Sequence, residues 1–243
     1  MLRYDLSGEA AWITIDRPEK RNALAVADWR EFARLLDRAA GEARVVVVTG
    51  VGDAFCAGDD IAALAAAETD AEVADLTDAL FDVLFGIERL DVPVVAAVNG
   101  LAYGGGCELV AASDLAVAVE DATFALPETT IGAYPPYAVE RIAATVGKKR
   151  LMELALTGEP IDAERAHDWG LVNRVVSADG LRETVGRFVT SIAETPATAT
   201  RTAKRAAAAS VASADERERV HESFATVLSD EDCRAASREF LDG

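Results

Sequence analysis

Two glutamates near a run of glycines have the residue types and the spacing of an acid–base pair. The glycine run at residues 104–106 is followed by Glu108 and, twenty residues later, by Glu128. Glycine leaves the main chain open to a ligand. If a helix starts near Gly106, the N–H of Gly105 lies at its positive end, and Glu108 shares that face. An N–H donor beside a carboxylate predicts a site for chemistry at a carbonyl group.

A second glycine turn follows another apolar run. Residues 45–49 are rich in valine without alternation, which is typical of a strand buried on both faces, and the chain then reaches Gly58, Asp59 and Asp60. An aspartate at this point is suited to cap the alanine-rich helix predicted after it. Two such turns, each after a buried strand, present two N–H groups to one oxygen. An enolate or a tetrahedral oxyanion requires that arrangement.

Short motifs recur over nearly the whole chain in the order and spacing of one enzyme family. They lie at residues 17–24, 55–60, 97–108, 127–128, 132, 156–158 and 166–172. By these motifs the chain resembles the enoyl-CoA hydratase/isomerase family, also called the crotonase family.

The resemblance implies an oxyanion hole in which the main-chain N–H groups of Asp59 and Gly105 bind a thioester oxygen. It also implies that Glu108 and Glu128 act as acid and base around a water molecule. The expected reaction is the addition of water across the double bond of a 2-enoyl-CoA through an enolate. Coenzyme A is then part of the substrate, and no separate cofactor or metal is expected.

The resemblance also assigns residues to coenzyme A binding. Two stretches match the parts of the family that hold the nucleotide end, and the matching residues are Arg21, Ala23, Ala57, Asp60 and Ile61. Arg21 is suited to reach a phosphate of coenzyme A, and it is equally compatible with a solvated surface arginine.

Other interpretations of the acidic residues stay open. Apolar residues surround Glu108, unlike a carboxylate on an exposed helix face, and a partly buried carboxylate needs a hydrogen-bonding or catalytic reason. Glu128 lies in a Pro-Glu-Thr-Thr turn, where it fits a helix cap equally well. Asp59 and Asp60 also fit capping roles, which are compatible with a main-chain donor at Asp59.

One position departs from the family pattern. Family hydratases have a glycine where this chain has Pro136, and the glycine N–H helps to hold the attacking water, whereas proline has no N–H. Either the two carboxylates or a tyrosine hydroxyl then hold the water, or the reaction differs. The alternatives are an enoyl-CoA delta-isomerase and an acyl-CoA thioester hydrolase. An alternative of another class is a catalytically weak acyl-CoA-binding subunit.

Alternating strands and helices predict an α/β fold, and the family fold is a crotonase-like spiral of strand–helix (ββα) units. We expect residues 1–194 to form the spiral core and residues 195–243 to form a C-terminal helical region. In the family that region mediates assembly, which implies a homotrimer or a hexamer. Within it the pattern predicts helices at 198–209, 215–228 and 230–241, with Phe240 matching a recurrent family phenylalanine.

Individual elements follow from local patterns in the core. Strands are predicted at 12–15, 45–49, 92–98, 115–119 and 171–176, from their apolar and β-branched residues. An amphipathic helix is predicted from Asp28 to Ala40, ended by Gly41, and an acidic helix is predicted over residues 71–90.

The composition limits the partners and the compartment. The net charge is −18, with 42 acidic and 24 basic residues, which disfavours a nucleic-acid partner. The acidic excess favours adaptation to high salt, and a GC-rich genome is the alternative explanation. No segment is apolar over a membrane-spanning length, so no membrane partner is expected. Three cysteines without metal-ligand spacing indicate a reducing, cytoplasmic location.

Overall fold

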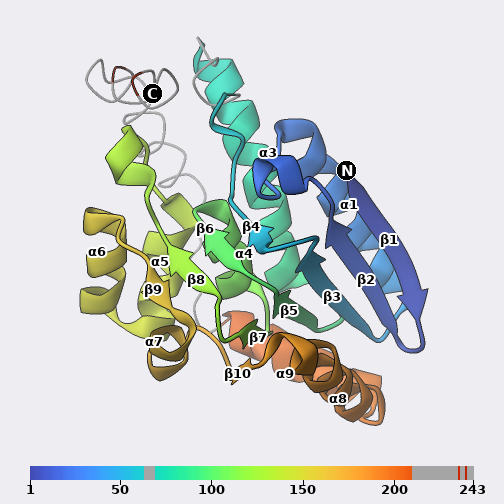
Figure 1. The fold of residues 1–243 in the computed structure, drawn as a ribbon. Coiled ribbons are helices and arrows are strands. Elements are labelled where there is room, and N and C mark those ends of the chain that lie inside the picture. Colours follow the sequence, from blue (N-terminus) through green and yellow to red (C-terminus); the bar gives the residue numbers. More distant parts are fainter. Residues whose placement is uncertain (63–68, 210–234, 236–238, 240–243) are drawn as a thin grey trace.

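The computed structural model describes residues 1–62, 69–209, 235 and 239, and its centre is a six-stranded sheet (Figure 1). In spatial order the strands are β1 (Leu2–Ser7), β2 (Ala10–Ile15), β3 (Val45–Gly50), β5 (Val94–Val98), β7 (Leu115–Val119) and β10 (Arg174–Val176). β1 is antiparallel to β2, and the other neighbours are parallel. Parallel neighbours require crossover connections, which here pass through further strands and helices.

A second sheet of short strands lies beside the first. Its order is β4 (Ala54–Cys56), β6 (Leu101–Tyr103), β8 (Thr123–Ala125) and β9 (Ile161–Asp162). Each of β3, β5 and β7 is followed along the chain by a short strand, namely β4, β6 and β8. The predicted α/β class and the ββα units are therefore confirmed.

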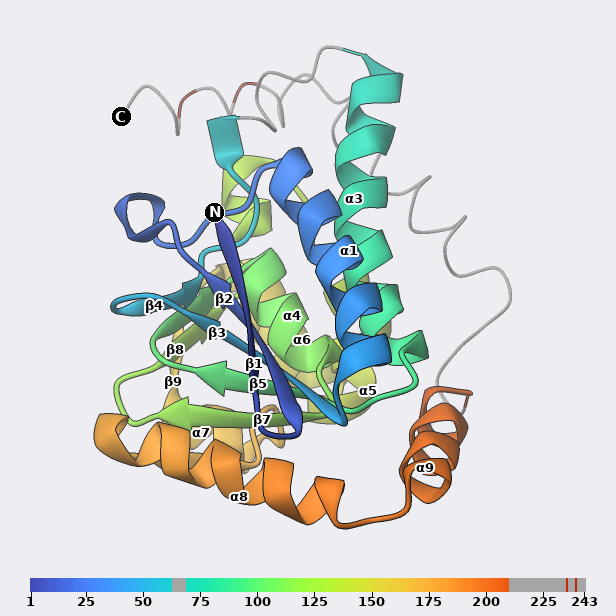
Figure 2. The ribbon, with the colours of Figure 1, turned by 90° about the vertical axis from the view of Figure 1, so that its right-hand side faces the viewer.

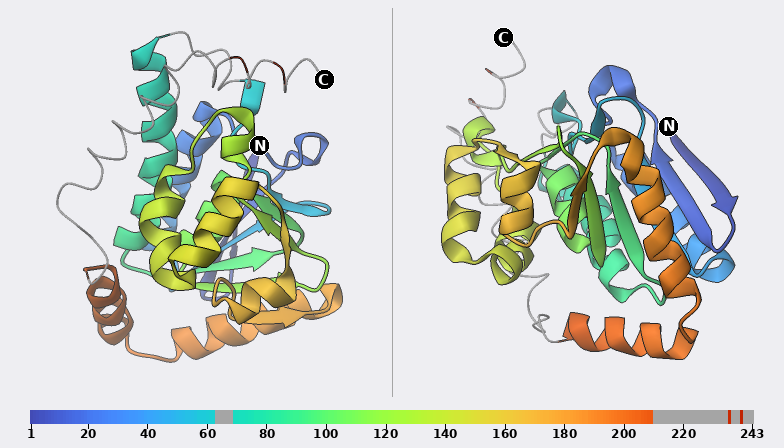
Figure 3. Two further views of the ribbon diagram at one scale, coloured as in Figure 1. Left: turned by 90° about the vertical axis from the view of Figure 1, so that its left-hand side faces the viewer. Right: turned by 60° about the horizontal axis from the view of Figure 1, so that its bottom comes forward.

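Helices cover both faces of the larger sheet. The helices of the described residues are α1 (Val26–Glu42), α3 (Asp70–Arg89), α4 (Gly105–Ala112), α5 (Pro136–Val146), α6 (Lys148–Thr157), α7 (Ala163–Asp168), α8 (Leu181–Ala193) and α9 (Ala197–Ala209). Short 3₁₀ helices are η1 (Pro18–Lys20), η2 (Glu128–Ile131) and η3 (Ala178–Gly180). α1 and α3 lie side by side over one face, as Figure 2 shows. α8 crosses the opposite face, and α9 follows it at the end of the sheet (Figure 3).

The run of valines in β3 divides its side chains between two cores. Val46 and Val48 pack with the residues of α1 and α3, whereas Val45 and Val47 pack in a smaller cluster that includes Val185 of α8. Successive side chains of a strand point to opposite faces. A strand covered on both sides therefore needs apolar residues at every position, which explains the absence of alternation.

Several predicted boundaries are wrong by a few residues. α1 begins at Val26 because the carboxylate of Asp28, in its first turn, accepts the N–H of Ala25 and so caps the start. The helix also continues through Gly41, which is exposed, where glycine costs only about 1 kcal/mol relative to alanine.

Two strands begin later than predicted. β5 starts at Val94, and β10 starts at Arg174 instead of residue 171. Asn173 pairs with Ala116 through its main-chain N–H and its side-chain oxygen, so the sheet pairing begins there. Leu171 and Val172 are apolar because they are buried in the preceding turn.

The C-terminal predictions have mixed outcomes. The helix predicted at 198–209 is confirmed as α9. The helices predicted at 215–228 and 230–241, and Phe240, lie outside the described residues. Among the residues that the structure does describe, none belongs to a helix long and apolar enough to cross a bilayer.

Candidate active site

A cavity of about 70 Å³ lies where the two glycine turns meet. Its walls come from the loop after β4, the start of α4, η2 and the start of α5, with Leu80 of α3 behind. The lining residues are Ala57, Asp59, Ile61, Leu80, Gly104, Gly105, Glu108, Pro127, Glu128, Ile131, Ala133, Tyr134 and Pro136. The structure thus brings all four predicted oxyanion and carboxylate residues to one cavity.

The two glycine turns touch because neither has side chains in the way. A Cβ on Gly58 would lie 2.8 Å from the nitrogen of Gly105, and a Cβ on Gly106 would lie 2.0 Å from the carbonyl oxygen of Cys56. Gly58 also has φ of +87°, which other residues rarely adopt. Glycine is therefore required at both positions to bring the loop after β4 against the start of α4.

The direction of the Asp59 N–H follows from its neighbours. Leu24 donates its N–H to the oxygen of Gly58 and accepts the N–H of Asp60, forming an isolated parallel bridge between Leu24 and Asp59. In a parallel bridge the central residue directs its own N–H and C=O away from that partner. The N–H of Gly105 is the first of α4, where the helix itself offers no acceptor. Both donors thus stand at the cavity wall.

Glu108 is 1% exposed and is held by the start of α5. Its Oε1 accepts the N–H of Ala138 at 2.7 Å, and the N–H of Tyr137 also binds this carboxylate. Burial raises the pKa of Glu108 to about 8, and the charge of Asp59 adds to this rise, whereas the two N–H groups oppose it.

Glu128, the first residue of η2, has a different environment. Its Oε2 is inaccessible to solvent and has no hydrogen-bond partner among the described residues. Its Oε1 lies beside Gly104, at whose position a Cβ would come within 3.2 Å. Burial, and then the charge of Glu108, raise the pKa of Glu128 well above its usual value. Two carboxyl groups sharing one cavity cannot both ionise easily, and Glu128 has the weaker support for a charge.

Asp59 brings a third carboxyl group to the cavity. The indole N–H of Trp29, on α1, donates to its Oδ1 at 2.8 Å. Burial raises the pKa of Asp59 to about 6, although the indole and the residue's own N–H lower it. The sequence pattern indicated Asp59 only through its main chain, and it gave no sign of Trp29, which lies thirty residues away.

The residues predicted to bind coenzyme A are divided between two places. Ala57 and Ile61 line the cavity. Ala23, the residue before Leu24, is buried. Asp60 pairs with Arg17 at 2.8 Å, and the Arg21 side chain is exposed outside the cavity.

Asn22 joins the first of these stretches to the residues just before and at the start of β4, and it was not among the predicted site residues. It is fully buried, its amide donates to the oxygens of Val51 and Ala54, and its Oδ1 accepts the N–H of Arg17. An asparagine that directly follows the charged residues 19–21 is the sequence signal of such a turn, and the structure places it at φ of +61°, in the left-handed region that asparagine tolerates.

Pro136 lines the cavity at the first position of α5, where proline is well tolerated. The next two N–H groups, those of Tyr137 and Ala138, are directed to Glu108. The missing donor at Pro136 follows from the sequence alone, whereas the use of the following donors to hold Glu108 required the structure.

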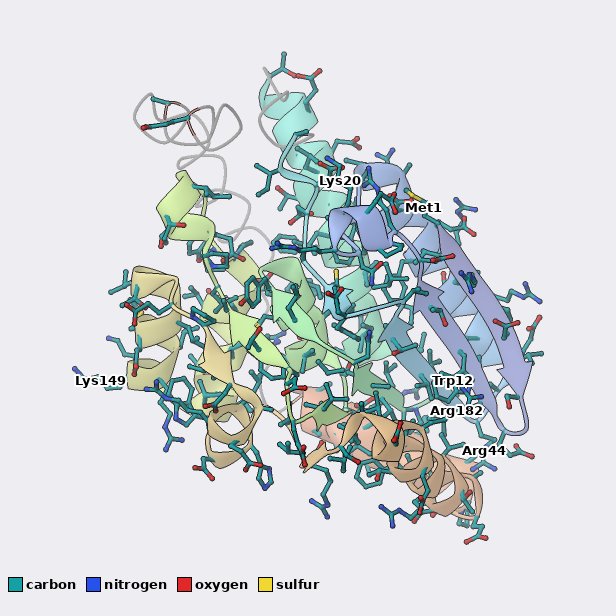
Figure 4. All side chains as sticks on the ribbon, viewed as in Figure 1. Met1, Trp12, Lys20, Arg44, Lys149 and Arg182 are labelled. Atoms are coloured by element: carbon teal, nitrogen blue, oxygen red, sulfur yellow. The ribbon has the colours of Figure 1, made fainter. Side chains whose placement is uncertain are left out.

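A larger cavity of about 600 Å³ lies between the β1–β2 turn and α8, where Figure 4 labels Trp12, Arg44 and Arg182. The Arg182 guanidinium lies 4.7 Å from the centre of the Trp12 ring, and Arg44 donates to the oxygen of Thr195. Both arginines thus make contacts within the chain. Within residues 1–62 and 69–209, no cluster of three His, Cys, Asp or Glu side chains is arranged to hold a metal.

Comparison with known proteins gives the class to which this fold and cavity belong. A family model described as enoyl-CoA hydratase/isomerase matches residues 6–242. The chain belongs to the enoyl-CoA hydratase/isomerase family.

Individual relatives are hydratases and dehydratases, which are lyases. Mevalonyl-coenzyme A hydratase of Aspergillus fumigatus is 38% identical over 186 residues, or 74% of this chain and 67% of the relative. Carnitinyl-CoA dehydratase of Citrobacter koseri is 41% identical over 186 residues, or 75% of this chain and 70% of the relative. Two solved structures cover 98% of this chain. An enoyl-CoA hydratase from Mycobacterium avium subsp. paratuberculosis has a TM-score of 0.88, 30% identity and 97% of its chain covered. A carnitinyl-CoA dehydratase from Mycobacterium avium has a TM-score of 0.86, 36% identity and 96% of its chain covered.

Proposed function

We propose that this protein is an enoyl-CoA hydratase, which adds water across the double bond of a 2-enoyl-CoA thioester. The observation that carries the proposal is the unequal support of two buried carboxyl groups in one cavity. Two main-chain donors bind Glu108 and offset part of the rise that burial causes in its pKa, whereas the buried Oε2 of Glu128 has no donor in the described chain, so Glu108 is the group of the two that ionises more easily. A base and an acid are thus available together.

The proposed reaction uses these groups in a balanced sequence. The N–H groups of Asp59 and Gly105 donate hydrogen bonds to the thioester oxygen and stabilise the enolate that forms. Glu108 takes a proton from water while the water oxygen bonds to the β-carbon, and the electrons of the double bond move to the thioester oxygen. The enolate then collapses and its α-carbon takes the proton of Glu128. Proton exchange with solvent restores both carboxyl groups.

Coenzyme A enters this scheme as part of the substrate. We propose that the stretches around Arg21, Ala23, Ala57, Asp60 and Ile61 hold its nucleotide end, since the bridge between Leu24 and Asp59 joins them to the oxyanion turn. The relatives named mevalonyl-coenzyme A hydratase and carnitinyl-CoA dehydratase support a hydration or dehydration reaction.

A delta-isomerase is the second candidate, and Pro136 favours it because no N–H there holds a water molecule. In an isomerase one carboxylate moves a proton between two carbons, so only one glutamate is essential. The two candidates therefore make different predictions for the same pair of variants.

The deciding experiment measures hydration of crotonyl-CoA, from the loss of its conjugated absorbance, for the wild type, Glu108→Gln and Glu128→Gln. For a hydratase each substitution lowers kcat by about 10²–10⁴-fold with little change in substrate binding. For an isomerase one substitution dominates, and exchange of the α-proton with deuterated solvent is faster than hydration. Hydration that survives both substitutions would exclude the two-carboxylate mechanism. Release of free thiol would identify a thioester hydrolase.

A further inference from the structure

Two side chains of α5 hold one carboxylate at the end of α3. Arg141 binds Glu88 through two nitrogens, with Nε to Oε1 at 2.6 Å and Nη2 to Oε2 at 3.1 Å. The hydroxyl of Tyr137 donates to the same Oε1 at 2.7 Å. A two-pronged guanidinium–carboxylate contact fixes orientation as well as distance, so this group sets how α5 lies against α3.

The contact is buried and continues into an aromatic cluster. The side chains of Arg141 and Glu88 are 6% and 15% exposed. Phe85, one turn before Glu88, meets the Tyr137 ring edge to face at 5.3 Å between ring centres, and the Arg141 guanidinium lies 5.4 Å from the Phe85 ring centre. Tyr137 and Arg141 are four residues apart and share one helix face.

The main chain of that same turn holds Glu108. Pro135 and Pro136 open α5 and supply no side-chain cap, and the next two N–H groups bind the Glu108 carboxylate. Tyr137 therefore contacts Glu88 through its side chain and Glu108 through its main chain. A rotation of α5 away from α3 would withdraw both donors from Glu108.

We propose that Glu88 and Arg141 are positioning residues for Glu108, which orient the first turn of α5 so that its N–H groups hold the Glu108 carboxylate in place. Neither residue lines the cavity. The effect on hydration rests on the proposed function, whereas the effect on Glu108 itself does not.

Loss of this contact should raise the pKa of Glu108 further. The N–H groups are what lower it against burial, and the other ionisable groups around the carboxylate do not replace them. These neighbours are Asp59 from the loop after β4, Cys107 on α4, Glu128 on η2, Tyr134 before α5 and Tyr137 on α5. All five bear a negative charge or none, so each opposes or leaves unchanged the ionisation of Glu108.

The test compares Glu88→Gln, Tyr137→Phe and the conservative Arg141→Lys with a control variant that removes another buried ion pair. Asp114 binds Lys204 at 2.6 Å, and the Lys204 side chain is 4% exposed, so Asp114→Asn removes a comparable pair that is hydrogen-bonded to no residue of α5, although the charge of Glu88 also acts on Lys204. Two readouts are used. One is the ¹³C carboxyl resonance of Glu108, assigned by its absence in Glu108→Gln and titrated against pH. The other is the pH profile of kcat for crotonyl-CoA hydration.

For Glu88→Gln we expect the Glu108 midpoint and the acidic limb of kcat to move up by about one pH unit, a tenfold loss below the midpoint. KM should stay within about twofold, because positioning acts on the base and not on substrate contacts. Tyr137→Phe, which keeps the ion pair, should give a smaller shift in the same direction. The shift in the Glu108 midpoint for Arg141→Lys should lie between the shifts for Tyr137→Phe and Glu88→Gln. Asp114→Asn should lower Tm without moving the midpoint.

An unchanged Glu108 midpoint in a folded Glu88→Gln protein, with a Tm loss like that of Asp114→Asn, would show a merely structural pair. If Glu88→Gln does not fold, an unchanged midpoint in Tyr137→Phe and Arg141→Lys overturns the proposal in the same way. If the wild type hydrates no enoyl-CoA, the proposed function fails, and the carboxyl titration alone decides the positioning role.

Discussion

Replacing Gly58 with alanine separates the geometry of the oxyanion turn from general stability. The backbone at Gly58 has φ of +87°, and an added Cβ would lie 2.8 Å from the Gly105 nitrogen and 2.9 Å from the Tyr103 oxygen. Both atoms belong to the main chain and neither can rotate away. The loop after β4 and the start of α4 must therefore move apart.

The expected magnitude has two parts. The left-handed backbone costs a non-glycine residue about 1–2 kcal/mol, which lowers Tm by roughly 2–4 °C per kcal/mol in a chain of this size. The 2.8 Å contact is about 0.6 Å shorter than the 3.4 Å at which ordinary contact begins, which displaces a donor from the thioester oxygen. Loss of one oxyanion donor costs about 10²–10³ in rate, so we expect kcat to fall by at least about 10².

Gly170→Ala is the matched control. Gly170 has φ of +83°, and an added Cβ would meet nothing closer than the Thr145 oxygen at 4.0 Å. The variant thus carries similar backbone strain without a collision, and we expect a similar loss in Tm with near wild-type kcat. Crotonyl-CoA hydration and thermal melting are measured on both proteins. If Gly58→Ala remains within about threefold of Gly170→Ala in kcat, the two turns do not form an oxyanion hole.

Three further predictions concern charge and assembly. Because burial raises the pKa of Asp59 from 3.8 to about 6, folding with an ionised Asp59 is unfavourable, and stability falls as pH rises between those values. Asp59→Asn should therefore raise Tm above pH 6 and have little effect on Tm near pH 3.8. A gain in Tm of equal size at all pH values would contradict this. At a net charge of −18, Tm should rise from low to molar KCl because salt screens self-repulsion, and a flat or falling trend would remove the high-salt interpretation. Light scattering should show a trimer or a dimer of trimers, as the family resemblance implies, and an active, monodisperse monomer would contradict it.

Local signals in the sequence predicted the parts of the fold that depend on local structure. The valine run at 45–49 predicted a strand covered on both faces, and β3 contacts two cores. The glycines at 58 and 104–106 predicted two open turns, which the structure brings to one cavity. Boundaries at Gly41 and Leu171 were wrong because neighbouring elements decided them. An exposed glycine is tolerated in a last turn, and a buried turn also needs apolar residues.

The supporting contacts of the site could not be predicted from local patterns. Trp29 reaches Asp59 across thirty residues, and Glu88 meets Arg141 across fifty-three. Periodicity shows that a helix has an apolar face, and it does not show which helix that face meets. The role of the α5 N–H groups depends on the path of the chain after Pro136, which brings them to Glu108.

The bridge between Leu24 and Asp59 has a consequence for how substrate length affects the rate. Residues 57–60 are hydrogen-bonded to residues 21–24 through the pairs Ala57–Arg21, Leu24–Gly58 and Asp60–Leu24, so one short ladder contains both the proposed nucleotide contacts and an oxyanion donor. Because the two segments are hydrogen-bonded to each other, restricting the motion of one also restricts the motion of the other. Binding of the adenosine phosphate of coenzyme A to this ladder would then restrict the motion of the Asp59 N–H that faces the reacting carbonyl. A thioester shortened to its pantetheine portion should consequently react more slowly at saturation, rather than only bind more weakly.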